Sequence, residues 1–109
     1  MRKSIYLFML GAMAIAGPVS VFAQGGDVAK GKEVFDQNCA VCHNADSTEK
    51  KMGPGLKGLF KKDKLANGKA VNDANVTAQI NEGGNGMPSY KDTLSAEEKT
   101  NLLAYLKTL

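Results

Sequence analysis

Residues 39–43 read Cys39-Ala40-Val41-Cys42-His43, and this Cys-x-x-Cys-His stretch decides how the rest of the chain is interpreted. On a turn of helix, Cys39, Cys42 and His43 stand at positions i, i+3 and i+4, so their side chains leave from one face. Two thiols placed in this way can bond to the two vinyl groups on one edge of a porphyrin, and the adjacent imidazole can ligate its iron. The pattern therefore predicts one covalent haem c, bound through Cys39 and Cys42, with His43 as an iron ligand.

Two other chemistries use a Cys-x-x-Cys pair. A redox disulfide usually lies in a βαβ setting, and no such pattern follows here. A structural zinc ion takes four protein ligands, whereas the chain has two cysteines and one histidine in total. An exported module with a Cys39–Cys42 disulfide and no haem is therefore the alternative to a haem protein.

The N-terminus has the pattern of a secretory signal peptide. Arg2 and Lys3 precede an apolar run over residues 5–16, and small residues precede the expected cleavage after Ala23. An uncleaved membrane anchor is the alternative, although the run is short for a membrane span. We therefore expect a signal peptide at residues 1–23 and a periplasmic protein.

The remaining residues, 24–109, have the length of one small domain. Chains of this size bury only about 60–65% of their unfolded surface, which leaves them marginally stable without help. A bound haem would supply the missing apolar core, in agreement with the absence of tryptophan and the aromatic content of 6%. We therefore expect the haem-free chain to be poorly folded.

The charge distribution is more informative than the net charge. The whole chain has a formal charge of +3, which falls to +1 without the two basic residues of the signal peptide. Ionised haem propionates would lower it further, so the charge does not indicate nucleic-acid binding. A local positive face could steer the protein toward an acidic redox partner, although an ordinary solvated loop would have the same composition. The lysines of this face are Lys50, Lys51, Lys57, Lys61, Lys62, Lys64 and Lys69.

The first half of the domain contains one clear helix. Asp27 is a suitable N-cap for a helix that runs to about Asn38. A short helix is expected around Leu56–Lys62, within a segment rich in lysine and glycine. The apolar positions of the first helix follow helical spacing and are Val28, Gly31, Val34 and Phe35.

Two further helices are expected in the second half. Asn72 or Asp73 caps a helix that continues through Ile80 and ends at a pair of glycines. Ser95 and Glu98 form a capping box at the start of the last helix. No alternating strand pattern and no repeat is visible, so the fold class is all-α. The apolar face of the last helix contains Leu102, Leu103, Tyr105, Leu106 and Leu109.

A haem iron bound by one histidine still needs a sixth ligand, and the mature domain contains two methionines. Met87 lies in the run Gly83–Pro88, which is unsuited to the interior of a helix or strand and can bring a thioether to iron. Met52 lies close to the attachment motif, where it is less suited to reach the opposite haem face, although chain reach alone does not exclude it. An ordinary buried role for Met87 is the alternative.

The order of the motifs resembles a class I cytochrome c, in particular the short monohaem carriers of bacteria and photosynthetic lumens. The resemblance covers residues 28–109 and rests on three motifs in order: Cys39–His43, Gly53-Pro54-Gly55-Leu56, and Gly86-Met87-Pro88. It implies the cytochrome c fold, in which three main helices surround one covalently bound haem and the N- and C-terminal helices cross.

The resemblance also implies roles for individual residues. Gly31 and Phe35 of the first helix would meet Tyr105 of the last helix. The carbonyl group of Pro54 would accept a hydrogen bond from the haem-binding histidine and fix the orientation of its ring. Leu56 would pack against the porphyrin. A plain turn would also explain the glycines around Pro54.

The ligand set implies the function. An iron ligated by His43 and Met87 has no open position for oxygen or substrate and can cycle between its ferric and ferrous states. The resemblance therefore implies a one-electron carrier and not an enzyme, a monomer that shuttles between a donor complex and a terminal oxidase or reductase. A five-coordinate haem protein that binds gas or has peroxidase activity is the alternative, and it requires that neither methionine ligates the iron.

Overall fold

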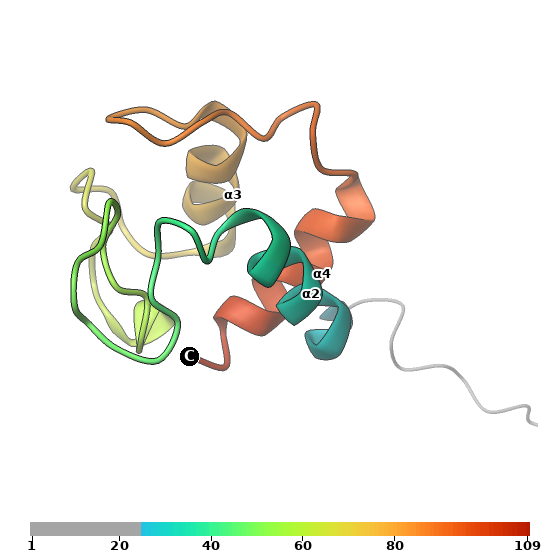
Figure 1. The fold of residues 1–109 in the computed structure, drawn as a ribbon, viewed down its shortest axis with the longest axis horizontal. Coiled ribbons are helices and arrows are strands. Elements are labelled where there is room, and N and C mark those ends of the chain that lie inside the picture. The colour runs from blue at the N-terminus through green and yellow to red at the C-terminus, as the bar shows by residue number, and fades with distance from the viewer. Residues whose placement is uncertain (1–24) are drawn as a thin grey trace, which may run out of the picture.

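The computed structural model describes residues 25–109, and the expected signal peptide lies outside this range. Within this range, four helical elements are joined by long irregular segments (Figure 1). Within the described range, β-pairing is limited to two isolated bridges, so the all-α fold class is confirmed. None of the described helices is both long and apolar enough to cross a membrane. The elements are α2 (Val28–Asn38), the short 3-10 helix η1 (Leu59–Lys61), α3 (Asp73–Glu82) and α4 (Ala96–Leu106).

Helix α2 begins and ends where the sequence predicts. The Asp27 side chain accepts a hydrogen bond of 3.1 Å from the backbone N–H of Lys30, which satisfies one of the free donors of the first turn. The last residue of the helix is Asn38, directly before the attachment motif. Its buried residues lie three and four positions apart and form one stripe: Gly31, Val34 and Phe35.

Helix α4 has the expected capping box. The Ser95 hydroxyl accepts from the backbone N–H of Glu98 at 3.1 Å, and the Glu98 carboxylate accepts from the backbone N–H of Ser95 at 3.0 Å. Leu109, expected on the apolar face of this helix, lies beyond its end and packs half-buried against the core. The buried residues of α4 are Asn101, Leu102, Ala104, Tyr105 and Leu106.

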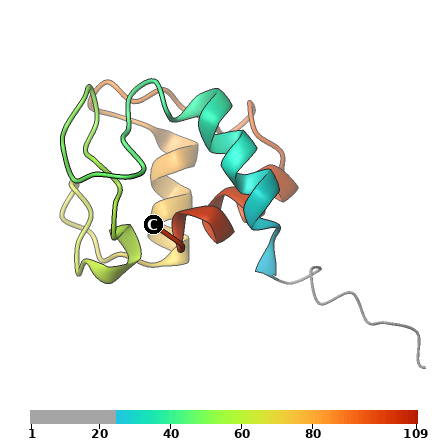
Figure 2. The same ribbon diagram turned by 60° about the horizontal axis from the view of Figure 1, so that its bottom comes forward.

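Helices α2 and α4 cross in contact, as both ribbon views show (Figures 1 and 2). A Cβ atom on Gly31 would collide with the backbone oxygen of Asn101 and would lie 2.9 Å from Cβ of Tyr105. The rings of Phe35 and Tyr105 pack with centroids 5.4 Å apart at an interplanar angle of 57°. A tilted aromatic pair of this kind contributes about 0.5–1.5 kcal/mol beyond its buried area. The expected crossing and its three residues are therefore confirmed.

One buried polar side chain also joins the two helices. Asn101 is only 7% exposed, and its Oδ1 atom accepts a hydrogen bond of 2.8 Å from the backbone N–H of Asp27. The pair fixes the N-terminus of α2 against α4, because breaking it would leave a buried polar group without a partner. The hydrophobic pattern did not single out Asn101, since a polar residue at a helical position is usually solvated.

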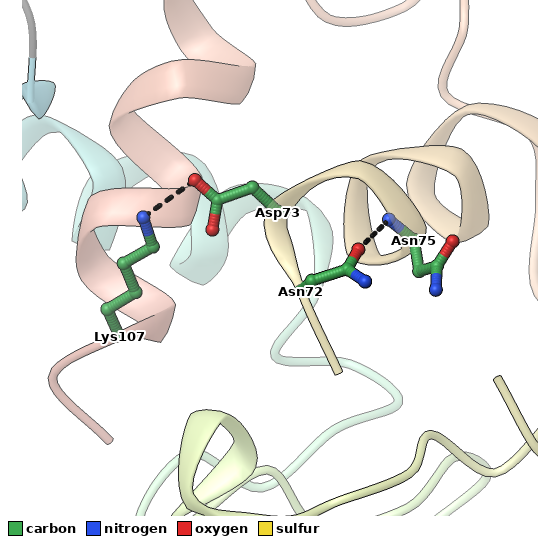
Figure 3. Close-up of polar contacts among 4 residues, drawn as sticks. All are labelled: Asn72, Asp73, Asn75 and Lys107. Atoms are coloured by element: carbon green, nitrogen blue, oxygen red, sulfur yellow. Dashed lines mark hydrogen bonds and ion pairs between the residues drawn. The ribbon is translucent and has the colours of Figure 1, made fainter. Parts of the chain in front are cut away.

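The N-terminus of α3 is held by two polar contacts (Figure 3). The residue that caps the helix is Asn72, whose side-chain oxygen accepts a 2.8 Å hydrogen bond from the backbone N–H of Asn75. Asp73 is instead the first helical residue, and its carboxylate lies 2.8 Å from Nζ of Lys107. This ion pair is exposed and contributes little energy, but it connects the start of α3 to the end of α4.

Helix α3 continues through Ile80 to Glu82 and ends at Gly83, the first of the expected pair of glycines, whose φ of 66° is outside the helical range. One expected boundary differs in the structure. The short helix expected around Leu56–Lys62 is reduced to the three residues of η1. Gly58 has left-handed backbone angles (φ 71°, ψ 22°), and a right-handed helix cannot continue through them.

We predict that replacing Gly31 by alanine lowers the free energy of unfolding by about 1–3 kcal/mol, because the added methyl group forces α2 and α4 apart. The gain in helix propensity offsets only part of this loss. Urea unfolding of the mature protein, followed by far-UV circular dichroism, measures the effect. Gly25→Ala is the matched control, since no atom of the described residues, apart from its chain neighbours, lies within 4 Å of a Cβ at that position. Equal midpoints for the two variants would contradict the close crossing.

Candidate haem-binding site

The attachment motif lies in a hydrogen-bonded turn directly after α2. The backbone N–H of Cys39 donates to the carbonyl group of Phe35 at 2.7 Å, which extends the helical bonding by one residue. The N–H of His43 then donates to the carbonyl group of Cys39 at 2.9 Å and closes one further turn. The i, i+3, i+4 arrangement is therefore built by this turn and not by α2 itself.

The two cysteines lack the features of a redox-active pair. Both are free thiols in the structure and half-buried. Burial and, to a smaller extent, the charge of Cys42 together raise the pKa of the Cys39 thiol to about 11. A reactive Cys-x-x-Cys pair needs the opposite, a thiol pKa lowered toward neutrality. The part of the chain that the structure describes also contains no group of three or more His, Cys, Asp or Glu side chains that could hold a metal ion, which disfavours zinc.

The imidazole of His43 is held from one side. Its Nδ1 atom lies 2.7 Å from the carbonyl oxygen of Pro54. A carbonyl group can only accept, so Nδ1 carries a hydrogen, and the tautomer that can bind a metal presents its lone pair on Nε2. Gly53 lies against the same ring, since a Cβ there would be 2.5 Å from Cε1. The Gly53-Pro54 segment therefore fixes the orientation of the His43 ring, which an ordinary turn would not do.

Met87 is presented by a tight two-residue turn. The N–H of Gly84 donates to the carbonyl group of Met87 at 2.9 Å, and the N–H of Met87 donates back at 3.0 Å. Between them Asn85 and Gly86 have φ values of 50° and 92°. Two central residues with positive φ are typical of a type I′ turn, for which Asn-Gly is the favoured sequence. The glycine-rich run is therefore an ordered support for the half-buried Met87 side chain.

Contacts with α3 fix the segment 83–90, here called the methionine loop, on both sides of this turn. On the N-terminal side, Nε2 of Gln79 lies 3.2 Å from the carbonyl oxygen of Gly83. The same Nε2 atom lies 3.6 Å from Sδ of Met87. On the C-terminal side, the N–H of Tyr90 donates to the carbonyl group of Ile80 at 3.0 Å. No sequence pattern indicates Gln79 as a neighbour of the sulfur, because its position depends on how α3 packs against the segment around Met87.

Tyr90 connects this loop to the cysteine motif. Its hydroxyl group donates a 2.9 Å hydrogen bond to the carbonyl group of Asn38, the last residue of α2. Burial raises the pKa of Tyr90, and the nearby Cys39 and Cys42 raise it further. The residues that follow Met87 therefore lie beside the attachment motif. The sequence patterns did not single out Tyr90. The only indication was that it is an aromatic residue in an otherwise polar loop.

Several apolar side chains of the described residues are only partly covered by the protein. A set of them packs against the buried core yet stays half exposed, and Leu56 belongs to this set. Covering apolar area of this kind is favourable, by about 25 cal/mol for each Å² removed from water. One imidazole and one thioether are available on separate segments, which is the donor set of a six-coordinate haem. The half-exposed set includes Cys39, Leu56, Phe60, Leu65, Val71, Met87, Tyr90 and Leu103.

The two candidate methionines differ in their surroundings. Met52 is 73% exposed and directly precedes Gly53, which touches the His43 ring. Met52 is therefore on the histidine side of the site. Met87 is half-buried, and its sulfur accepts the hydrogen bond from Gln79. These environments favour Met87 as the second axial ligand.

Comparisons with known proteins find matches over most of the chain. A family model described as cytochrome c oxidase, cbb3-type, subunit III matches residues 26–106. Cytochrome c6 from Rippkaea orientalis is 35% identical over 106 residues, which cover 97% of this chain and 92% of that protein. Cytochrome c oxidase subunit 2 from Alkalihalophilus pseudofirmus is 34% identical over 86 residues, or 73% of this chain and 25% of that protein. The structure of cytochrome c6 from the diatom Phaeodactylum tricornutum matches with a TM-score of 0.60 and 32% identity, over 76% of this chain and 93% of that chain.

Proposed function

The chain belongs to the class I c-type cytochromes, and we propose that it is a periplasmic one-electron carrier whose haem iron is ligated by His43 and Met87. As a cytochrome of the c6 type, it is an electron carrier with one covalent haem c and not an enzyme. The ligands and the compartment are our assignment. The compartment rests on the basic and apolar pattern at residues 1–23.

The observation that carries the ligand assignment is the fixed imidazole of His43. Its hydrogen bond to Pro54 and its contact with Gly53 leave Nε2 as the only free ring nitrogen. A ligating histidine is usually held in this way by a carbonyl group or carboxylate, which fixes the ring and raises its basicity. The same contacts keep the ring in place when the charge of the metal changes.

The other residues complete the site. The thiols of Cys39 and Cys42 would hold the haem through two thioether bonds, and Met87 would supply the sixth ligand from its type I′ turn. The bound haem supplies an iron that accepts and releases one electron. With His43 and Met87 both bound to the iron, neither oxygen nor a small substrate would have a place to bind.

The names of two matches support our choice of redox partner. One relative is named as an oxidase subunit and contains a segment like this chain within a longer protein, and the matching family model is also named for an oxidase subunit. We therefore propose a terminal oxidase as the electron acceptor and a membrane-bound complex as the donor. The chain would act as a separate monomer that forms small, transient contacts with both.

The lysines between residues 50 and 69 support electrostatic steering toward these partners. All seven are exposed. The ion pairs of the described residues involve Lys32 and Lys107 and none of this group. Lysines that remain unpaired keep their full attraction for a carboxylate-rich surface. A solvated loop without a partner would show the same exposure, so kinetics must distinguish the two.

The proposed function predicts the composition and redox behaviour of the mature protein. Material produced with the haem-attachment machinery should have the mass of the chain plus one haem and should titrate as a single one-electron couple. The ferrous protein should not bind carbon monoxide at neutral pH, because Met87 occupies the sixth position. Rapid binding would support the five-coordinate alternative, and a colourless product with unmodified thiols would support the disulfide alternative.

Met87→Ala should abolish the weak long-wavelength absorption band of the oxidised protein that marks a methionine–iron bond. It should also open the site to carbon monoxide. Met52→Ala is the matched control, since the same side chain is removed from an exposed position, and it should leave both properties unchanged. A band that persists in Met87→Ala and disappears in Met52→Ala would reverse the assignment.

Electron transfer to an acidic partner should slow by about tenfold between low and physiological ionic strength if the lysine face steers association. Replacing both Lys61 and Lys62 by glutamate should lower the rate at low salt and flatten this dependence. Lys30→Glu introduces the same kind of charge change on the exposed surface of α2 and serves as the control. Stopped-flow kinetics against salt concentration measures each case, and a flat profile for the wild type would exclude steering.

A further inference from the structure

A series of hydrogen bonds runs from the loop at residues 65–70 to the sulfur of Met87. The backbone N–H of Lys69 donates to Oδ1 of Asn67 at 2.9 Å, and Nδ2 of Asn67 donates to Oε1 of Gln79 at 3.1 Å. Nε2 of Gln79 then lies 3.6 Å from Sδ of Met87. This contact gives the loop that contains Asn67 a role that its composition did not suggest.

Backbone groups fix the direction of every amide in the series. The N–H of Lys69 can only donate, so Asn67 must turn its oxygen toward Lys69 and its NH₂ group toward Gln79. Gln79 must then accept with its oxygen and direct its own NH₂ group to the other side. There the carbonyl group of Gly83, at 3.2 Å, can only accept and requires the same orientation. A rotated Gln79 amide would bring oxygen against oxygen at Gly83 and oxygen against sulfur at Met87.

The loop that carries Asn67 is itself held in place. The N–H of Leu65 donates to the carbonyl group of Lys69 at 2.8 Å and closes a tight turn around Asn67. The side-chain amide of Asn75, on α3, donates to the carbonyl group of Ala70 at 2.9 Å and ties the loop to the helix that carries Gln79. Asn67 is therefore presented to Gln79 by ordered backbone, although it lies at the surface.

We propose that Asn67 is a positioning residue for electron transfer, which holds the Gln79 amide with an N–H toward the sulfur of Met87 and thereby raises the reduction potential. The proposal rests on the proposed function, with Met87 as an iron ligand. A thioether sulfur has two lone pairs, one for the metal and one for a donor. An N–H on the second lone pair withdraws electron density, weakens donation to the metal and favours the ferrous state.

The test compares reduction potentials of haem-loaded variants. Asn67→Ala removes the donor to Gln79 without adding charge and should lower the equilibrium constant for reduction about threefold, or about 28 mV at 59 mV per tenfold change for one electron. Asn67→Asp presents only acceptors to Gln79 and should lower it further. Ala66→Asp places the same charge at the neighbouring exposed position and controls for simple electrostatics.

Two further readouts separate positioning from a structural effect. The absorption band that marks methionine ligation should remain in Asn67→Ala, and the side-chain amide signals of Gln79 in the ferrous protein should shift in its NMR spectrum. In a Gln79→Leu background, Asn67→Ala should have no effect on the potential, because the intermediate amide is gone.

Equal potentials for Asn67→Ala and wild type, or equal shifts in both backgrounds, would overturn the proposal. If Met87→Ala retained the ligation band, the proposed function itself would fail.

Discussion

The close crossing of α2 and α4 is the contact on which the remaining structure depends. Gly31 allows the backbones to approach, and the Phe35–Tyr105 pair fills the space beside it. Because the attachment motif follows α2 without a break, this crossing also determines where the cysteines and the histidine lie. The positions of the cysteines and the histidine therefore depend more on how α2 packs against α4 than on the short turn of the motif itself.

The methionine side of the site depends on a different helix. Helix α3 has fewer contacts with α4 than α2 has, and its ends are fixed by polar groups: the Asp73–Lys107 ion pair at one end and the bonds around Gln79 at the other. The Tyr90 hydroxyl then joins the methionine loop to the end of α2. This hydrogen bond joins the segments that carry the two proposed axial ligands, while their buried apolar side chains belong to one core cluster. A bound haem would add a further connection between the two segments.

Local patterns predicted the helices and their caps because the relevant contacts are close in sequence. Asp27 and the Ser95–Glu98 pair act within one turn, and each was identified correctly. The choice between Asn72 and Asp73, and the shortened η1, depended on backbone angles that composition does not determine. The roles of Asn101, Tyr90 and Gln79 were not predictable from periodicity, since each bonds a group from another element. The role of Pro54 was predicted from the family resemblance, because the composition of the turn alone did not indicate it.

Each proposed axial ligand forms a hydrogen bond with another group of the protein: His43 with an acceptor and Met87 with a donor. Pro54 accepts a hydrogen bond from His43, which makes the imidazole a stronger donor and favours the ferric state. Gln79 donates to Met87, which makes the thioether a weaker donor and favours the ferrous state. The first contact lies within a turn next to the motif, whereas the second depends on Asn67 in a loop far along the chain. Substitutions in that surface loop could therefore change the potential while the histidine side, the helix crossing and the covalent attachment remain unaltered.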